Sequence, residues 1–102
     1  METVEPDACR TMAEVRAGVD ALDRELVALL ARRFAFMRAA ARIKPHREDV
    51  RDERRKAEVI ASARAEARSH GLPEDAMAQI WDALVEASIE FELAEWELRR
   101  RL

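Results

Sequence analysis

The feature that most constrains the fold is a helical pattern that runs unbroken from Thr11 to Lys44. Apolar side chains recur along it at alternating spacings of three and four residues, which is the repeat of one helix face. We call this face the apolar seam, and it comprises Met12, Val15, Val19, Leu22, Leu26, Leu29, Phe36 and Ala40. Pro45 ends the pattern, because the residue before a proline is pushed out of the helical region.

The length of this helix predicts the oligomeric state. About 33 residues rising ~1.5 Å each give a helix of ~50 Å, whereas a compact chain of this size has a radius of gyration of only ~13 Å. One chain cannot cover the apolar seam along its whole length. We therefore expect an intertwined helical homodimer in which a second copy buries the seam.

The rest of the chain also predicts an all-α fold with three helices, one long and two shorter. Only 2 Gly and 3 Pro occur among the 102 residues, and 49% are hydrophobic, a composition typical of long helices with few turns. We expect a loop at 45–50 and a second helix at about 51–70. Gly71 suits the C′ position of that helix, and Pro73 suits the N1 position of a third helix that runs to the end.

Several function classes are disfavoured by composition. The net charge of −3 comes from interleaved acidic and basic residues, which argues against binding to nucleic acid or to a membrane surface. The basic run at 99–101 is expected to lie against the dipole of its own helix end. Cys9 is the only cysteine, so an intrachain disulfide and a cysteine zinc cluster are excluded.

Residues 1–10 show neither helical periodicity nor the basic and apolar regions of a signal peptide. They predict a flexible lead, followed by one helical domain at 11–102. No window of the sequence approaches a membrane span. We expect a cytoplasmic protein.

A cation interrupts the apolar seam. Arg33 occupies the seam position between Leu29 and Phe36, and Lys44 returns to within ~20° of the same face eleven residues later. Arg33 alone could extend toward solvent or pair with an internal carboxylate. Two inward cations near one helix end are better explained by a bound anion, since arginine holds a carboxylate in a bidentate fork.

Arg16 lies ~25 Å from Arg33 along the same helix, so it cannot serve the same pocket in one chain. In an antiparallel dimer it could reach the middle of the second copy's long helix and complete that copy's site. The alternative is an ordinary solvated surface arginine.

In the third helix, one carboxylate departs from the solvent face that the others share. Asp82, Glu86, Glu90 and Glu97 cluster on that face, whereas Glu92 points into the stripe of Trp81, Val85, Ser88 and Trp96. Desolvation there favours the neutral acid, which donates a hydrogen bond. Glu95 has a comparable angle, and either residue could instead pair with an arginine.

No nucleophilic or metal-binding constellation is visible, and we expect neither a cofactor nor a metal. Ser62 and Ser88 lack a histidine at a supporting spacing. His46 and His70 lie near helix ends, where solvated histidines are common, and the spacing of Glu66 from His70 is a weak metal signal.

These exceptions resemble a known pattern. The segments VRAGVDALD at 15–23, LLARR at 29–33 and ARIK at 41–44 are similar to the first helix of the all-α chorismate mutases. The segments VRD at 50–52 and EAS at 86–88 also fall in register, so the resemblance covers essentially the whole chain. Its relatives include the isochorismate-pyruvate lyases of salicylate formation.

The resemblance implies an intertwined helical dimer that binds a dicarboxylate substrate without a cofactor. It implies that Arg33 and Lys44 hold the substrate within one chain, while Arg16 arrives from the second copy. Asp52 would contact the ring hydroxyl and Ser88 would support a carboxylate. Glu92 would face the ether oxygen, to which Lys44 is the natural hydrogen-bond donor.

Two positions depart from the family pattern. Lys56 stands where mutases commonly carry a glutamate beside the ring hydroxyl, and Glu92 stands where many members have glutamine. The expected activity is the rearrangement of chorismate to prephenate in aromatic amino acid biosynthesis. Isochorismate-pyruvate lyase is the alternative enzyme, which Lys56 favours and Asp52 disfavours, and a non-catalytic helical dimerisation module is the alternative of another class. The sequence names no regulatory partner enzyme.

Overall fold

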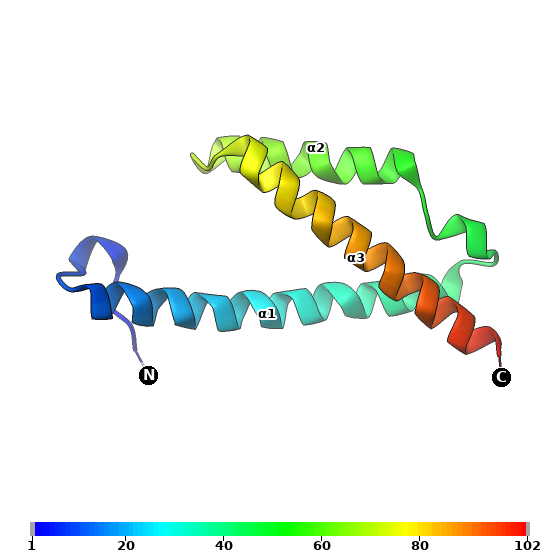
Figure 1. Cartoon of the computed structure of the whole chain (residues 1–102), viewed down its shortest axis with the longest axis horizontal. Helices are drawn as coiled ribbons and strands as arrows, with labels where there is room; N and C mark the ends of the chain where they lie inside the picture. The colour runs from blue at the N-terminus through cyan, green and yellow to red at the C-terminus, as the bar shows by residue number, and fades with distance from the viewer. Residues whose placement is uncertain (1, 102) are drawn as a thin grey trace. The chain divides into compact units, whose positions relative to one another are not determined.

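The computed structural model describes residues 2–101, which contain three α-helices, two short 3-10 helices and no strand. Helix α1 spans Met12–Ile43, α2 spans Glu53–Ser69 and α3 spans Glu74–Arg100, as labelled in Figure 1. The 3-10 helices are η1 at Pro6–Ala8 and η2 at Arg47–Asp49. The expected all-helical class with three α-helices is confirmed, and the helix ends lie one or two residues inside the expected bounds.

Local side-chain chemistry explains where the helices begin. At the start of α1, Thr11 Oγ1 accepts from the Glu14 N–H and Glu14 Oε1 accepts from the Thr11 N–H, at 3.2 and 3.1 Å. This reciprocal capping satisfies two backbone donors of the first turn. Asp52 caps α2 by accepting from the Arg55 N–H at 3.0 Å, as expected of an aspartate at the N-cap position.

The turn between α2 and α3 is set by one glycine and one proline. Gly71 has a φ of 70°, a conformation that glycine adopts without steric cost. The Gly71 and Leu72 N–H groups donate to the Arg68 and Ala67 carbonyls, which is the hydrogen-bond pattern of a Schellman motif. Pro73 is the N-cap of α3 and not its N1 residue, so the expectation for Pro73 was one position off.

The chain divides into two compact units, one within Met1–Ala35 and the other within Phe36–Leu102. In the second unit, α2 and α3 form a helical hairpin that packs around Val50, Val85 and Ile89. These three side chains are 4–8% exposed, and Val59, Leu93 and Trp96 pack against them. The core is small and lies between the helices of this unit.

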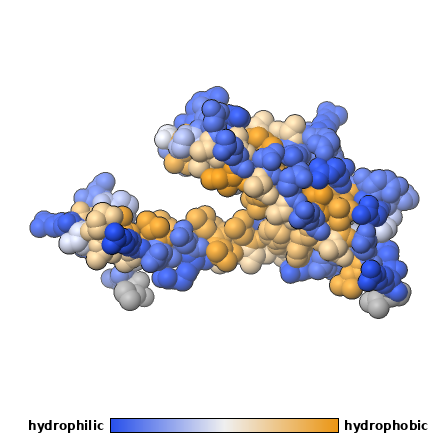
Figure 2. All heavy atoms as spheres, in the orientation of Figure 1, coloured by the Kyte–Doolittle hydropathy of each residue, from blue (hydrophilic) through white to orange (hydrophobic). Residues whose placement is uncertain are grey.

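The first unit contains η1 and the greater part of α1, and no residue of 2–35 is buried. Val19, Leu22 and Leu26 of the apolar seam are 49%, 57% and 55% exposed, and Figure 2 shows hydrophobic residues on the surface along this part of α1. The lead at 2–10 includes the turn of η1, and its flexibility stays a prediction.

None of the helices in residues 2–101 combines the length and the apolar character needed to cross a membrane.

Candidate active site

A partly buried ion pair joins the end of α1 to α3. Pro45 terminates α1, and Lys44 is the last residue before it. Lys44 Nζ donates to Glu92 Oε2 at 2.7 Å, and the two side chains are 30% and 5% exposed. Glu92 faces inward as the periodicity of the third helix predicts. Its partner is Lys44, which the helical wheel could not reveal.

Ser88 and Asp52 lie in the same unit as this pair. Ser88 is one helical turn before Glu92 on α3, is 4% exposed, and its hydroxyl donates to the Leu84 carbonyl at 2.7 Å. Asp52 is exposed, and its Oδ1 is occupied by the capping bond to Arg55. Asp52 therefore already has a structural role at the start of α2.

Arg16 and Arg33 belong to the first unit. Arg16 is exposed on α1, and Arg33 is half-buried. The partial burial of Arg33 is consistent with its place in the apolar seam.

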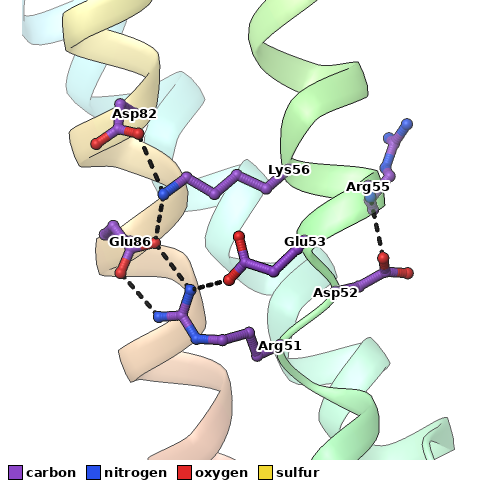
Figure 3. Close-up of polar contacts among 7 residues, drawn as sticks. All are labelled: Arg51, Asp52, Glu53, Arg55, Lys56, Asp82 and Glu86. Atoms are coloured by element: carbon purple, nitrogen blue, oxygen red, sulfur yellow. Dashed lines mark hydrogen bonds and ion pairs between the residues drawn. The ribbon is translucent and has the colours of Figure 1, made fainter.

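A second charged cluster joins α2 to α3, and Figure 3 shows its side chains. Lys56 Nζ lies 2.8 Å from Glu86 Oε2 and 3.1 Å from Asp82 Oδ1. Arg51 donates from both guanidinium nitrogens to the Glu86 carboxylate, at 2.8 and 3.1 Å, and also pairs with Glu53. Asp82 and Glu86 are 54% and 38% exposed, consistent with the predicted solvent face, and both carboxylates also bind Lys56 of α2, which the helical wheel did not reveal.

The electrostatics of this cluster favour its charged forms. Hydrogen bonds from Arg51 and Lys56 lower the pKa of Glu86 from 4.5 to about 2. The hydrogen bond to Glu86, followed by that to Asp82, raises the pKa of Lys56 above its ordinary value. The carboxylates of Asp82 and Glu86 on α3 thus balance the charge of Lys56. Its ammonium is already paired and is not free to bind an anionic ligand.

Two side chains that sequence reasoning missed contact the backbone of Lys44. Trp96 Nε1 donates to the Lys44 carbonyl at 3.0 Å, and the Arg100 guanidinium donates to the Lys44 and Ala41 carbonyls at 2.7 and 2.8 Å. The expectation that Arg100 lies against its own helix end was wrong, since it caps α1. The missing N–H of Pro45 was the available signal that α1 needed a donor from elsewhere.

A groove of about 310 Å³ also lies between α2 and α3. It contains none of the expected site residues, and its apolar lining includes Val59, Leu72, Met77 and Trp81. In residues 2–101, no group of three or more His, Cys, Asp and Glu side chains is arranged to hold a metal ion.

The fold and the site define a class of protein: an all-helical domain with a partly buried lysine–glutamate pair where its long helix ends. Residues 15–93 match the family described as chorismate mutase type II. The match covers more than three quarters of the 102 residues, and the chain belongs to this family. It therefore carries a chorismate mutase-type domain. No curated protein matches the chain in sequence.

Proposed function

We propose that the chain is a chorismate mutase, an isomerase that rearranges chorismate to prephenate as a homodimer. The observation that carries this proposal is the partly buried contact of 2.7 Å between Lys44 Nζ and Glu92 Oε2. These are the two positions that the family resemblance assigns to the ether oxygen. The rearrangement is an intramolecular pericyclic reaction, so catalysis consists of selecting the reactive conformer and stabilising developing charge.

In the proposed mechanism, Lys44 donates a hydrogen bond to the ether oxygen, on which negative charge develops as the C–O bond breaks. An ionised Glu92 would repel both that oxygen and the dianionic substrate. Substrate binding therefore favours the neutral form of Glu92, because a nearby like charge disfavours ionisation. Glu92 takes up one proton from solvent as the substrate binds. The neutral acid then releases Lys44 from the ion pair and becomes a second donor to the ether oxygen.

The remaining expected site residues bind the substrate. Arg33 holds a carboxylate within the same chain, and Arg16 of a second copy holds the other, each through a bidentate fork. Asp52 accepts from the ring hydroxyl through the oxygen that does not cap α2. Ser88, one turn from Glu92, supports a carboxylate through its hydroxyl.

The exposed apolar seam of α1 supports the proposed dimer. Val19, Leu22 and Leu26 are each about half exposed. Burying the exposed half of one such side chain contributes about 1 kcal/mol to the stability of the dimer. In a two-fold dimer each position occurs in both copies, so its contribution is doubled. A second copy that covers the seam also brings Arg16 to a site that lacks it.

A two-substrate assay tests the proposed reaction directly. The purified protein is incubated with chorismate and, separately, with isochorismate, and prephenate, salicylate and pyruvate are quantified. We expect prephenate from chorismate at a much higher kcat/KM than salicylate from isochorismate. The reverse ratio would assign the chain to the lyase, and no turnover of either substrate would refute an enzymatic role.

The Glu92→Gln variant tests the protonation step. In the wild type, kcat/KM should fall as pH rises and Glu92 ionises. Glutamine cannot ionise, so the variant should have a flatter alkaline limb. Glu95→Gln is the matched control, because Glu95 lies on α3 and pairs with Arg38 and Arg99 instead of Lys44. A wild-type profile that stays flat from acid to mild alkali would contradict the mechanism.

One observation favours the lyase as a second candidate. Lys56 replaces the glutamate that mutases commonly place beside the ring hydroxyl, and its ammonium is bound by Asp82 and Glu86. A non-catalytic dimerisation module is the alternative of another class. The absence of a thermal shift with a dicarboxylate transition-state mimic would favour that module.

A further inference from the structure

The end of α1 has a backbone acceptor that its own helix cannot satisfy. In a continuing helix, the Ala41 carbonyl would accept from the N–H of residue 45. Residue 45 is a proline and has no N–H. Ala41 is 0% exposed, so the missing hydrogen bond has to be replaced by a protein donor, since burial of an unpaired carbonyl is costly.

Arg100, at the C-terminal end of α3, provides that donor. Its Nη1 donates to the Ala41 carbonyl at 2.8 Å, and its Nη2 donates to the Lys44 carbonyl at 2.7 Å. The two bonds come from one planar group, so they fix the two carbonyls relative to each other. The positive charge also lies at the negative end of the α1 dipole.

Trp96 makes this contact rigid. It lies one turn before Arg100 on α3, and its Nε1 donates to the same Lys44 carbonyl at 3.0 Å. The Arg100 guanidinium stacks 4.3 Å from the centre of the Trp96 ring. Trp96 also packs against the core around Val85 and Ile89, which connects the cap to the most buried part of the second unit.

The same helix that holds the Lys44 backbone carries the partner of its side chain. Glu92 lies one turn before Trp96 on α3 and binds Lys44 Nζ at 2.7 Å. Glu92, Trp96 and Arg100 recur every four residues and therefore lie along one face of α3. Lys44 is thus held at its carbonyl and at its ammonium by a single row of side chains.

We propose that Arg100, supported by Trp96, is a positioning residue that sets where the Lys44 ammonium lies relative to Glu92 and the substrate. This inference rests on the proposed function, in which Lys44 acts on the ether oxygen. Arg100 acts through the Lys44 backbone, so it affects the rearrangement step, in which the Lys44 ammonium has to lie at the ether oxygen. Its loss should therefore lower kcat more than it raises KM.

The test compares Arg100→Met, Arg100→Lys and the control Arg101→Met, using the full chain. Arg101 is exposed and adjacent in sequence, so its loss removes the same charge from the same end of the chain. Arg100→Met should lower kcat by about tenfold to a hundredfold, a cost typical of a misplaced catalytic group, with little change in KM. Arg100→Lys keeps the charge but cannot bridge both carbonyls, and should lie between Arg100→Met and the wild type.

A second measurement is independent of activity. The chain has only two lysines, Lys44 and Lys56, so acetylation with a water-soluble succinimidyl ester can be followed at each by peptide mass spectrometry. The ratio of Lys44 to Lys56 labelling should rise severalfold in Arg100→Met and stay at the wild-type value in Arg101→Met. Lys56 is the internal reference, because its contacts with Glu86 and Asp82 are separate from Arg100.

The outcomes separate this inference from the proposed function. A lower kcat together with a higher labelling ratio supports the positioning role. If the wild type turns over neither substrate, the proposed function fails, and a higher ratio in Arg100→Met still supports the placement of Lys44 by Arg100. Wild-type kcat and an unchanged ratio in Arg100→Met, with only a lower unfolding temperature, would reduce Arg100 to a structural cap and overturn the inference.

Discussion

In the second unit, α2 and α3 cover Val50, Val85 and Ile89, whereas in the first unit Val19, Leu22 and Leu26 remain about half exposed. Both sets are aliphatic, and both lie on helices with a clear apolar face. The difference is the number of neighbouring helices that each unit provides. The second unit builds its own core, and the first presents a face that an additional chain would complete.

The largest effect should follow from a charge in the exposed seam. In Leu26→Glu, about 1 kcal/mol of burial is lost at each of two copies, and the desolvated carboxylate added at each copy costs about 1 kcal/mol or more. The dimer dissociation constant should rise by about a thousandfold, as measured by sedimentation equilibrium. Arg24→Glu, on the opposite face of α1, is the control. An unchanged constant in Leu26→Glu would show that the seam is not the dimer interface.

The second-largest effect should follow from the removal of Arg33, the cation within the apolar seam. Arg33→Ala should lose more than roughly 3 kcal/mol of transition-state stabilisation, because it removes the charged hydrogen bond to the substrate that we propose for Arg33. This loss lowers kcat/KM by more than a hundredfold. Arg32→Ala removes a neighbouring exposed arginine and should keep most of the activity. Near-normal turnover in Arg33→Ala would exclude Arg33 from the site.

Shortening one apolar side chain in each unit tests how much each unit contributes to the stability of the fold. Ile89→Ala in the core should lower the free energy of unfolding by about 2 to 3 kcal/mol, through lost burial and a cavity. Val27 is 65% exposed and lies outside the apolar seam, so Val27→Ala should change the free energy of unfolding by less than about 0.5 kcal/mol. Urea unfolding measures both values, and equal losses would contradict the assignment of the core to the second unit.

The smallest effect concerns the cluster between α2 and α3. The pKa of Glu86 lies at about 2 in the folded chain, below its ordinary value of 4.5. Its contribution to stability is therefore present above pH 4.5 and is lost as pH falls toward about 2. In Glu86→Gln, the urea midpoint should fall less steeply across this window than in the wild type. Glu90→Gln, which changes an exposed carboxylate of α3, should keep the wild-type slope.

The features that were predictable from sequence are those with local causes. Pro45, Gly71 and Pro73 act on their own backbone, so the helix ends could be located to within one or two residues. The inward direction of Glu92 follows from the periodicity of a single helix. A helical wheel orients a residue only within its own helix, and it carries no information about which neighbouring helix that residue meets.

The missed contacts all depend on how two helices meet. The pairing of Lys44 with Glu92 joins residues 48 apart, and the bond from Arg100 to Ala41 joins residues 59 apart. Arg51, just before α2, likewise reaches Glu86 on α3. In each case, the residue types were visible in the sequence, and their partners depended on tertiary packing.

The cluster around Lys56 also has a consequence for how this site can change over evolutionary time. Lys56→Glu, the exchange toward the residue that mutases commonly carry, would place a third carboxylate beside Asp82 and Glu86 in one step. That repulsion makes the single exchange unfavourable unless Asp82 or Glu86 changes first. The substitutions at these three positions should therefore be epistatic, and the order in which they occur should decide which intermediates fold.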